Sequence, residues 1–211
     1  MTDTIALFDL DGVILNTENN YTWFWNKIGK EYLGVEGFGL KVKGQTLVRI
    51  FNDAFPSEDD RSAIKKELFE FERDMKYEYI PGAEAFIDGI RALGIRSAVV
   101  TSSERAKMHN VFLNLPDFKD KFERILMSED FKESKPSPDG FLTGMRVLGG
   151  TPETSVVFED SINGLKAGKA SGAFLVGLAT SNPPEIVGRY ADLVIPDFTA
   201  LEPSGILSIF Q

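Results

Sequence analysis

Two aspartates, Asp9 and Asp11, follow an apolar run in the sequence ALFDLDGVILN (residues 6–16). In an extended backbone, side chains two residues apart point to the same side. Two carboxylates placed in this way repel each other unless one is protonated or a cation lies between them. The alternative is a pair of solvated loop aspartates beside Gly12, a composition that is common in turns. The spacing alone leaves both interpretations open.

A second acidic pair, Glu159 and Asp160, follows another apolar run in SVVFEDSINGLKAG (residues 155–168). If both runs are strands of a parallel sheet, their carboxyl ends lie at one edge, where the four carboxylates could meet. Oxygen ligands of this kind suit Mg²⁺. Asp160 could instead cap a helix that starts at Ser161, but capping does not account for Glu159. The second pair therefore favours a metal site.

Hydroxyl and lysine side chains follow two further apolar runs. In SAVVTSS (residues 97–103), the hydroxyls and amides of Thr101, Ser102 and Ser103 stand at an expected helix start, where they can bind an anion. Ser103 is also expected to be the N-cap of that helix. In ESKPSPDGF (residues 133–141), Pro136 restricts Lys135 to an extended geometry. That geometry suits a lysine aimed into a cleft, although most exposed lysines are only solvated charges.

The elements that must position these side chains alternate along the chain. The continuous apolar runs predict buried parallel strands at residues 5–8, 97–100, 124–127, 155–158, 173–178 and 191–195. Helical patterns between them cover residues 83–93, 103–115, 138–148 and 161–171, with Gly172 at a C-cap position. This alternation predicts an α/β fold with a Rossmann-like, doubly wound parallel sheet.

One long interval breaks the alternation. Residues 17–33, 44–54 and 57–78 have helical patterns, and no convincing strand separates them. We therefore expect an inserted α-helical cap, residues 16–79, above a discontinuous core of residues 1–15 and 80–211. Such a cap would cover the carboxyl edge of the sheet, which is where open α/β sheets bind their ligands.

Composition limits the classes of function. The chain has 211 residues, 43% of them apolar, and a formal net charge of −9. This acidity argues against binding to nucleic acid or to anionic membranes, and the lack of cysteine excludes disulfides and cysteine nucleophiles. No signal peptide or membrane span is recognised, so we expect a cytoplasmic protein. The sequence does not determine the oligomeric state, for which a monomer is the working expectation.

Taken together, these motifs resemble those of the haloacid dehalogenase superfamily of hydrolases. The resemblance is to the subgroup with a helical cap after the first strand, which includes phosphoglycolate phosphatase and β-phosphoglucomutase. FDLDGV matches the first motif of the family, Thr101 the second, KPSPD with Lys135 the third and FEDSINGLKAG the fourth. The four motifs occur in order, and the resemblance covers essentially the whole chain.

The resemblance implies a role for each matching residue. Asp9 would attack the phosphoryl group, and Asp11 would act as general acid and then general base. Mg²⁺ would be bound by the Asp9 carboxylate, the Asp11 backbone carbonyl and Asp160, with Glu159 binding directly or through water. The phosphoryl oxygens would be held by Thr101, the Ser102 amide and Lys135. True dehalogenases lack the second aspartate, so Asp11 favours phosphoryl transfer.

We therefore expect a Mg²⁺-dependent phosphatase that acts on a small phosphomonoester, such as a sugar phosphate. The alternatives are a β-phosphoglucomutase-like phosphotransferase and a catalytically silent binding protein on the same fold. In the cap, Tyr21 and Leu47 stand where the mutases have a histidine and an arginine, which favours hydrolysis. Lys43 and Arg49, together with Tyr21, are candidates for contacting the substrate.

Overall fold

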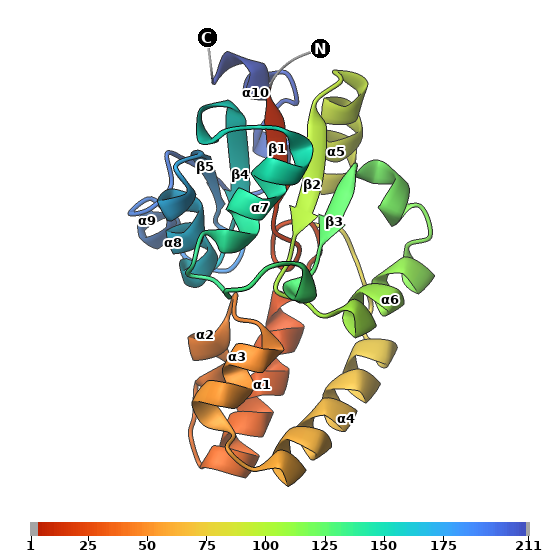
Figure 1. Cartoon of the computed structure of the whole chain (residues 1–211), viewed down its shortest axis with the longest axis vertical. Coiled ribbons are helices and arrows are strands. Elements are labelled where there is room, and N and C mark those ends of the chain that lie inside the picture. Colours follow the sequence, from red (N-terminus) through yellow and green to blue (C-terminus); the bar gives the residue numbers. More distant parts are fainter. Residues whose placement is uncertain (1–3, 210–211) are drawn as a thin grey trace.

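The core of the molecule is a six-stranded parallel sheet, seen in a computed structural model that describes residues 4–209 (Figure 1). The strand order is β3-β2-β1-β4-β5-β6. The strands are β1 (Ile5–Phe8), β2 (Arg96–Val100), β3 (Arg124–Leu126), β4 (Ser155–Glu159), β5 (Phe174–Leu178) and β6 (Leu193–Ile195). The predicted α/β class and doubly wound sheet are confirmed.

The register of the sheet brings the ends of its central strands to one edge. Phe8, the last residue of β1, lies opposite Val99 of β2 and Phe158 of β4. All five pairs of neighbouring strands run parallel. Every residue of β1 and β4 is buried, as expected for strands covered on both faces. The residues that follow β1, β2 and β4 therefore emerge side by side.

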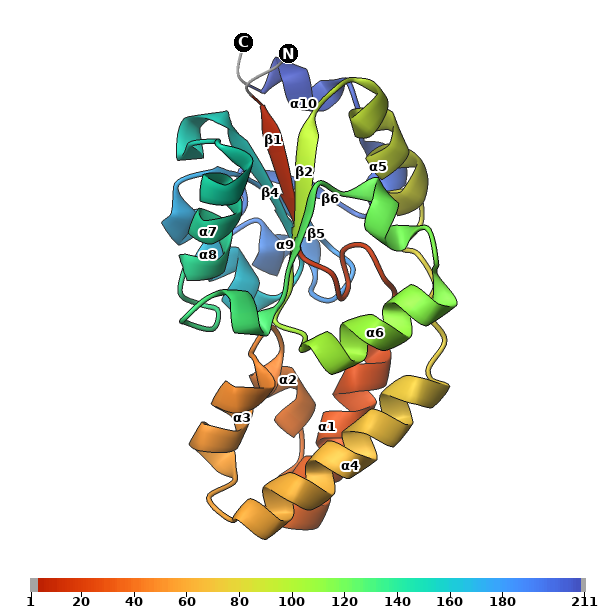
Figure 2. The ribbon, with the colours of Figure 1, turned by 45° about the vertical axis from the view of Figure 1, so that its right-hand side comes forward.

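Helices cover both faces of the sheet (Figure 2). One layer is formed by α5 (Ala83–Ala92), α6 (Arg105–Asn114) and α10 (Gly205–Ser208), and the other by α7 (Asp139–Leu148), α8 (Ile162–Ser171) and α9 (Pro184–Val187). The four predicted helices differ from α5, α6, α7 and α8 by at most two residues at either end. Short 3₁₀ turns occur at Phe118–Lys121, Ser128–Asp130, Pro152–Thr154 and Phe198–Ala200.

The inserted segment forms four helices below the carboxyl edge of the sheet in Figure 1. They are α1 (Glu18–Leu33), α2 (Phe38–Val42), α3 (Leu47–Ala54) and α4 (Glu58–Asp74). Their buried side chains form a separate apolar cluster, in which the rings of Trp25 and Phe38 pack edge to face with centroids 6.3 Å apart. The short helix α2 was not predicted, and α4 ends four residues earlier than expected.

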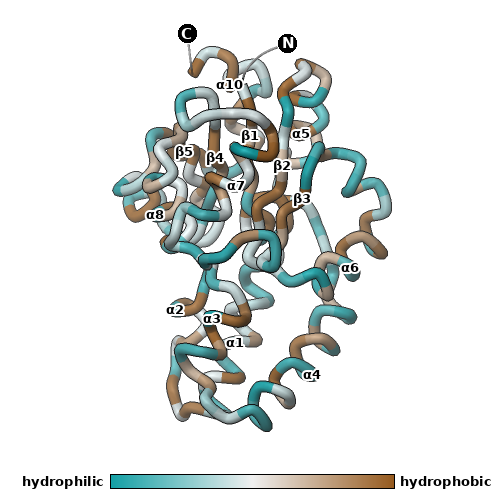
Figure 3. The backbone as a smooth tube through the Cα atoms, viewed as in Figure 1, coloured by the Kyte–Doolittle hydropathy of each residue, from teal (hydrophilic) through white to brown (hydrophobic). Residues whose placement is uncertain are grey.

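The hydropathy of each element matches how far that element is buried. In Figure 3, brown runs along much of β1 and β4, whereas teal and brown alternate along α1 and α4, which are only partly buried. Within residues 4–209, no helix is long and apolar enough to cross a membrane.

A loop of the cap docks directly on the core. The Ser102 hydroxyl donates a hydrogen bond to the Gly44 carbonyl (3.0 Å), and the Asn163 amide donates to the Lys43 carbonyl (2.8 Å). The Thr46 amide donates to the Ser134 hydroxyl (2.9 Å). These contacts hold the cap over the edge at which the predicted site residues emerge. We propose the division into a core (residues 1–15 and 80–211) and a cap (residues 16–79) as two structural units.

Candidate active site

Asp9 lies just beyond the end of β1. Its amide donates to the Phe158 carbonyl (3.0 Å), so the sheet pairing continues for one residue and fixes the backbone at this position. The side chain is 7% exposed and forms an ion pair with Lys135. Burial raises the pKa of Asp9 to about 8, although the Lys135 ammonium works in the opposite direction. This carboxylate therefore depends on nearby cations to remain ionised at neutral pH.

Glu159, the last residue of β4, links Lys135 to the start of α8. One carboxylate oxygen accepts from the Lys135 ammonium at 2.6 Å. The other accepts from the backbone amides of Asp160 (2.7 Å) and Ser161 (2.8 Å). A side chain at Gly164 would overlap this carboxylate, which accounts for the glycine there. Because both oxygens have partners, Glu159 is suited to positioning Lys135.

Asp160 is fully buried, and neither of its carboxylate oxygens has a hydrogen-bond partner among the described residues. Burial raises its pKa well above the ordinary value. It does not cap α8, because the Ser161 hydroxyl takes that position and accepts from the Gly164 amide (3.1 Å). A buried carboxylate without a partner is costly, and a bound cation removes that cost.

The donor set around Asp160 fits a hard divalent cation. Carboxylate oxygens of Asp9, Glu159 and Asp160 lie within 4.8 Å of one another, and all three residues are buried. Oxygen-only ligation of this kind favours Mg²⁺ over softer metals. Gly12 approaches the triad so closely that a Cβ atom there would overlap the Asp160 carboxylate, and its φ of +79° also favours glycine.

Asp11 lies apart from the triad, because its carboxylate has a lysine of its own. The Lys107 ammonium is 2.5 Å from both carboxylate oxygens. The Thr17 hydroxyl donates to one of these oxygens, and the Ser103 hydroxyl donates to the other at 3.1 Å. Of the four carboxylates expected to lie together, only those of Asp9, Glu159 and Asp160 do so among the described residues. Separate lysines for Asp9 and Asp11 explain how the two aspartates are accommodated close together.

The turn after β2 departs from one expectation. Ser103 is not the N-cap of α6, because Glu104 occupies that position without a capping side-chain hydrogen bond. The Ser103 hydroxyl is engaged instead by Asp11 and by the Lys107 ammonium (3.0 Å). The Ser103 amide donates to the Thr101 hydroxyl (3.0 Å), which closes the turn.

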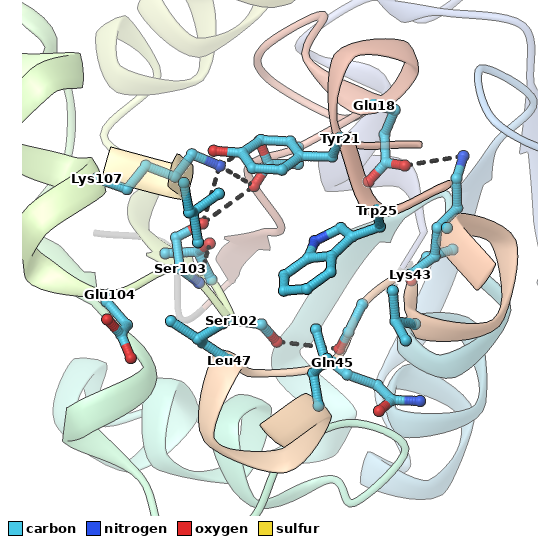
Figure 4. A pocket seen from close by; sticks show the side chains of 18 of the residues that line it. Glu18, Tyr21, Trp25, Lys43, Gln45, Leu47, Ser102, Ser103, Glu104 and Lys107 are labelled. Carbon is cyan, nitrogen blue, oxygen red and sulfur yellow. Dashed lines mark hydrogen bonds and ion pairs between the residues drawn. The ribbon is translucent and has the colours of Figure 1, made fainter. Parts of the chain in front are cut away.

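A cavity separates the cap from these core residues (Figure 4). The core lines it with Asp9, Asp11, Thr101, Ser102, Ser103, Glu104, Lys107 and neighbours, and the cap contributes Tyr21, Trp25, Lys43, Leu47 and others. Lys43 lies in the cavity wall and forms an ion pair with Glu18 (2.8 Å). Lys135 lies beneath this cavity, buried between Asp9 and Glu159.

Arg49, predicted as a candidate for contacting the substrate, does not line the cavity. Its guanidinium pairs with Asp53 (3.4 Å), and it lines a separate surface hollow on the outer side of α3. Successive helix residues are about 100° apart, so the face that turns Leu47 and Ile50 into the cavity turns Arg49 away.

Two residues of the site escaped the sequence analysis, namely Lys107 and Glu72. The Lys107 ammonium lies 4.2 Å from the centre of the Tyr21 ring, and the Tyr21 hydroxyl donates to the Glu72 carboxylate (2.8 Å). Burial raises the pKa of Glu72 to about 7. The i, i+4 spacing of Ser103 and Lys107 could have indicated Lys107. No local pattern links Glu72 on α4 to Tyr21 on α1.

Comparison with known proteins places the chain in a family. A family model described as haloacid dehalogenase-like hydrolase matches residues 6–178. The chain therefore belongs to the haloacid dehalogenase-like hydrolases and is an enzyme of that family.

Individual proteins are similar to the chain at identities of 31% or lower. The chain is 31% identical, over 90% of its length, to the bifunctional riboflavin kinase/FMN phosphatase of Arabidopsis thaliana, and it spans 52% of that protein. It is 30% identical, over 92% of its length, to 2-deoxyglucose-6-phosphate phosphatase 1 of Saccharomyces cerevisiae, covering 88% of that protein. The structure of β-phosphoglucomutase from Clostridium difficile matches with a TM-score of 0.79 at 23% identity, covering 100% of this chain and 97% of that one, and shows the shared fold.

Proposed function

We propose that this phosphoric monoester hydrolase is a Mg²⁺-dependent phosphatase that releases phosphate from a small metabolite through an aspartyl-phosphate intermediate. The observation that carries the proposal is the buried Asp9 carboxylate, which lies beside Lys135 and within the acidic triad. The two named relatives that are phosphatases support it, because FMN and 2-deoxyglucose 6-phosphate are both small phosphomonoesters. A sugar phosphate or related metabolite is the proposed substrate class.

In the first step, a carboxylate oxygen of Asp9 attacks phosphorus, and the bond from phosphorus to the substrate oxygen breaks. Asp11 donates a proton to that oxygen, so the alcohol leaves and the phosphoryl group remains on Asp9. The Lys135 ammonium, the Thr101 hydroxyl and the Ser102 amide bind the phosphoryl oxygens and neutralise part of their charge.

In the second step, water attacks phosphorus and Asp11 removes a proton from that water. Phosphate leaves, and the Asp9 carboxylate is regenerated. Asp9, Asp160 and the backbone carbonyl of Asp11 would hold Mg²⁺, which would neutralise charge on the phosphoryl group. Glu159 has its own hydrogen-bond partners and would contribute by orienting Lys135 or through water.

A phosphoglucomutase-like transfer is the main alternative. A mutase must grip the second phosphate of a bisphosphorylated intermediate. In this cavity Tyr21 and Leu47 supply no cation for it, and Arg49 lies outside.

A silent binding protein is disfavoured because every position of the four catalytic motifs is filled. A cytoplasmic location and a monomeric state remain predictions from the sequence.

The experiment that separates hydrolysis from transfer uses β-glucose 1-phosphate with Mg²⁺ and a catalytic amount of glucose 1,6-bisphosphate. We expect inorganic phosphate to be released faster than glucose 6-phosphate is formed. Faster formation of glucose 6-phosphate would favour the mutase. An aryl phosphate assayed in parallel tests the silent alternative, which predicts no phosphate release at all.

A further inference from the structure

The cavity between cap and core contains more carboxylates than lysines. It is lined by the carboxyl groups of Asp9, Asp11, Glu18, Glu72 and Glu104, whereas its basic residues are Lys43 and Lys107. Each of these lysines already has a carboxylate partner, because Lys43 pairs with Glu18 at 2.8 Å and Lys107 with Asp11 at 2.5 Å. Among the described residues that line the cavity, none is a cation without a carboxylate partner.

These ion pairs are sheltered from solvent, which makes them difficult to break. The side chains of Lys43 and Glu18 are each 13% exposed, and that of Lys107 is 3% exposed. A substrate anion that recruited Lys43 would leave the Glu18 carboxylate buried without its partner. Removing one member of a buried pair is strongly unfavourable, because the remaining charge is not compensated by water.

Glu104 adds a carboxyl group without a direct ion-pair partner to the same cavity, and the nearest influences on it are the charges of Lys65 and Glu129. It is half-buried at the start of α6, and neither a hydrogen bond nor an ion pair to its carboxylate is found within residues 4–209. Figure 4 shows Glu104 beside Leu47, on the side of the cavity away from Lys43. A second anionic group on the substrate would be repelled there.

The cap presents an apolar wall to the same space. It is formed by Trp25 of α1, Leu47 and Ile50 of α3 and Leu68 of α4, all of them buried. The Trp25 indole projects into the middle of the cavity (Figure 4). An aromatic face of this kind packs well against the carbon–hydrogen face of a sugar, polyol or ring.

We propose that the substrate carries one phosphate on an uncharged organic group whose carbon–hydrogen face packs against Trp25, and that the cavity discriminates against a second phosphate or a carboxylate. This inference rests on the proposed function, because it places the single phosphate at Asp9. Glu104 and Trp25 are then the residues that determine specificity.

The test compares substrates that differ in one charged group. The pairs are glycerol 3-phosphate with 3-phosphoglycerate, and glucose 1-phosphate with glucose 1,6-bisphosphate. Initial rates of phosphate release with Mg²⁺ give kcat/KM for each. We expect kcat/KM to be at least about tenfold lower for the anionic member of each pair, which is a modest share of the penalty for an uncompensated buried charge. Equal or faster hydrolysis of the anionic members would overturn the inference.

Two substitutions locate the discrimination. Glu104→Gln removes one charge without changing the shape of the side chain. In each substrate pair, it should lower the ratio of kcat/KM for the uncharged member to kcat/KM for the anionic member at least about threefold, the size expected for a partly screened charge. Glu153→Gln is the matched control, because Glu153 is exposed in the turn before β4, at the end of the sheet away from the cap. An unchanged ratio in Glu104→Gln would contradict the assignment.

Trp25→Ala should raise KM for the uncharged substrates more than it lowers kcat, and Trp25→Phe should restore most of the loss. Equal KM values in the wild type and in Trp25→Ala would remove Trp25 from the proposal.

If the wild type with Mg²⁺ releases phosphate from no substrate, an aryl phosphate included, the proposed function itself fails and this inference falls with it. Phosphate release with a preference for anionic substrates overturns the inference alone.

Discussion

Asp9 and Asp11 are two residues apart, yet their carboxylates have different surroundings. Asp9 is buried beside Lys135 and the acidic triad, whereas Asp11 faces the cavity and is held by Lys107 and two hydroxyls. Different environments allow two chemically identical groups to take different roles in one reaction. The deeper carboxylate suits the nucleophile, and the one that faces the cavity suits proton exchange with the leaving group.

Lys107 is expected to position Asp11 for that proton exchange. Lys107→Met keeps the apolar stem but removes the charge that holds the Asp11 carboxylate, so kcat should fall about tenfold to a hundredfold, with a smaller change in KM. Steady-state kinetics measure both values, and Lys166→Met, at an exposed position of α8, is the control. A kcat equal to that of the wild type would show that Asp11 needs no such support.

The residues of the core that the sequence analysis identified are those that follow strands. Asp9 and Asp160 come together because each stands one position beyond a central strand, and Lys135 reaches the same edge from the loop after β3. Lys107 and Glu72 lie on helices, and their partners are set by how α6 and α4 pack. That packing is not encoded in any short spacing, so neither residue was predicted.

Among the elements, the loop of residues 43–46 forms hydrogen bonds between cap and core. Gly44 has a φ of +72°, and a Cβ atom there would lie 2.5 Å from the Ser161 hydroxyl oxygen. Gly44→Ala should therefore displace the loop and lower kcat/KM about tenfold, in addition to destabilising the backbone by about 1 kcal/mol.

Gly34→Ala is a matched control for this substitution. Gly34 has a similar φ of +65°, but nothing lies within 4 Å of a Cβ atom built there. It should show the same loss of stability by urea unfolding and unchanged kcat/KM. If the two variants lose activity equally, the contact with Ser161 does not matter.

Glu72 joins α4 to α1 and faces Tyr21, Lys107, Asp11 and Glu104. Burial raises its pKa from 4.5 to about 7. Between these values the carboxyl ionises in the unfolded chain but stays protonated in the folded protein. The contribution of Glu72 to the free energy of unfolding is therefore fully present below about pH 4.5 and is lost as pH rises to about 7.

Glu72→Gln should remove this pH dependence. Urea unfolding at about pH 5 and about pH 7.5 measures the free energy of unfolding of both proteins. The wild type should lose about 2 kcal/mol more than the variant between these conditions, because one pKa unit corresponds to about 1.4 kcal/mol. Parallel pH profiles for the two proteins would mean that Glu72 is ionised in the folded state at neutral pH.

The elements themselves could be predicted to different degrees. Strands and core helices have strong apolar patterns, and their bounds were predicted to within about two residues. Helix α2 has five residues, too few for a periodic pattern, and it forms because Phe38 packs on Trp25. Helix α4 stops at Asp74 because the chain must return to the core, where the Asn16 amide donates to the Glu78 carbonyl (2.8 Å).

At the scale of the whole molecule, the acidic triad predicts that a bound metal ion stabilises the folded protein. Mg²⁺ that binds only the folded protein should raise the free energy of unfolding by about 2.7 kcal/mol at about 100 times its dissociation constant. Thermal unfolding with and without Mg²⁺ measures this. Asp160→Asn should abolish the rise, because a neutral amide cannot replace the buried Asp160 carboxylate as a ligand of the cation.

The exposed control Asp120→Asn should keep the full response to Mg²⁺. A rise in melting temperature that persists unchanged in Asp160→Asn would place the metal elsewhere. This measurement does not require knowledge of the substrate, so it tests the metal site independently of catalysis.

The central claim is that Asp9 forms a covalent link to the transferred phosphoryl group. The most direct test is the rate of phosphate release from 4-nitrophenyl phosphate with Mg²⁺ by the wild type and by Asp9→Asn, with the fold of both checked by circular dichroism. The account predicts a loss of kcat of at least about 10³-fold in Asp9→Asn, because the amide cannot serve as the nucleophile. A folded Asp9→Asn protein with kcat within about tenfold of the wild type would contradict it.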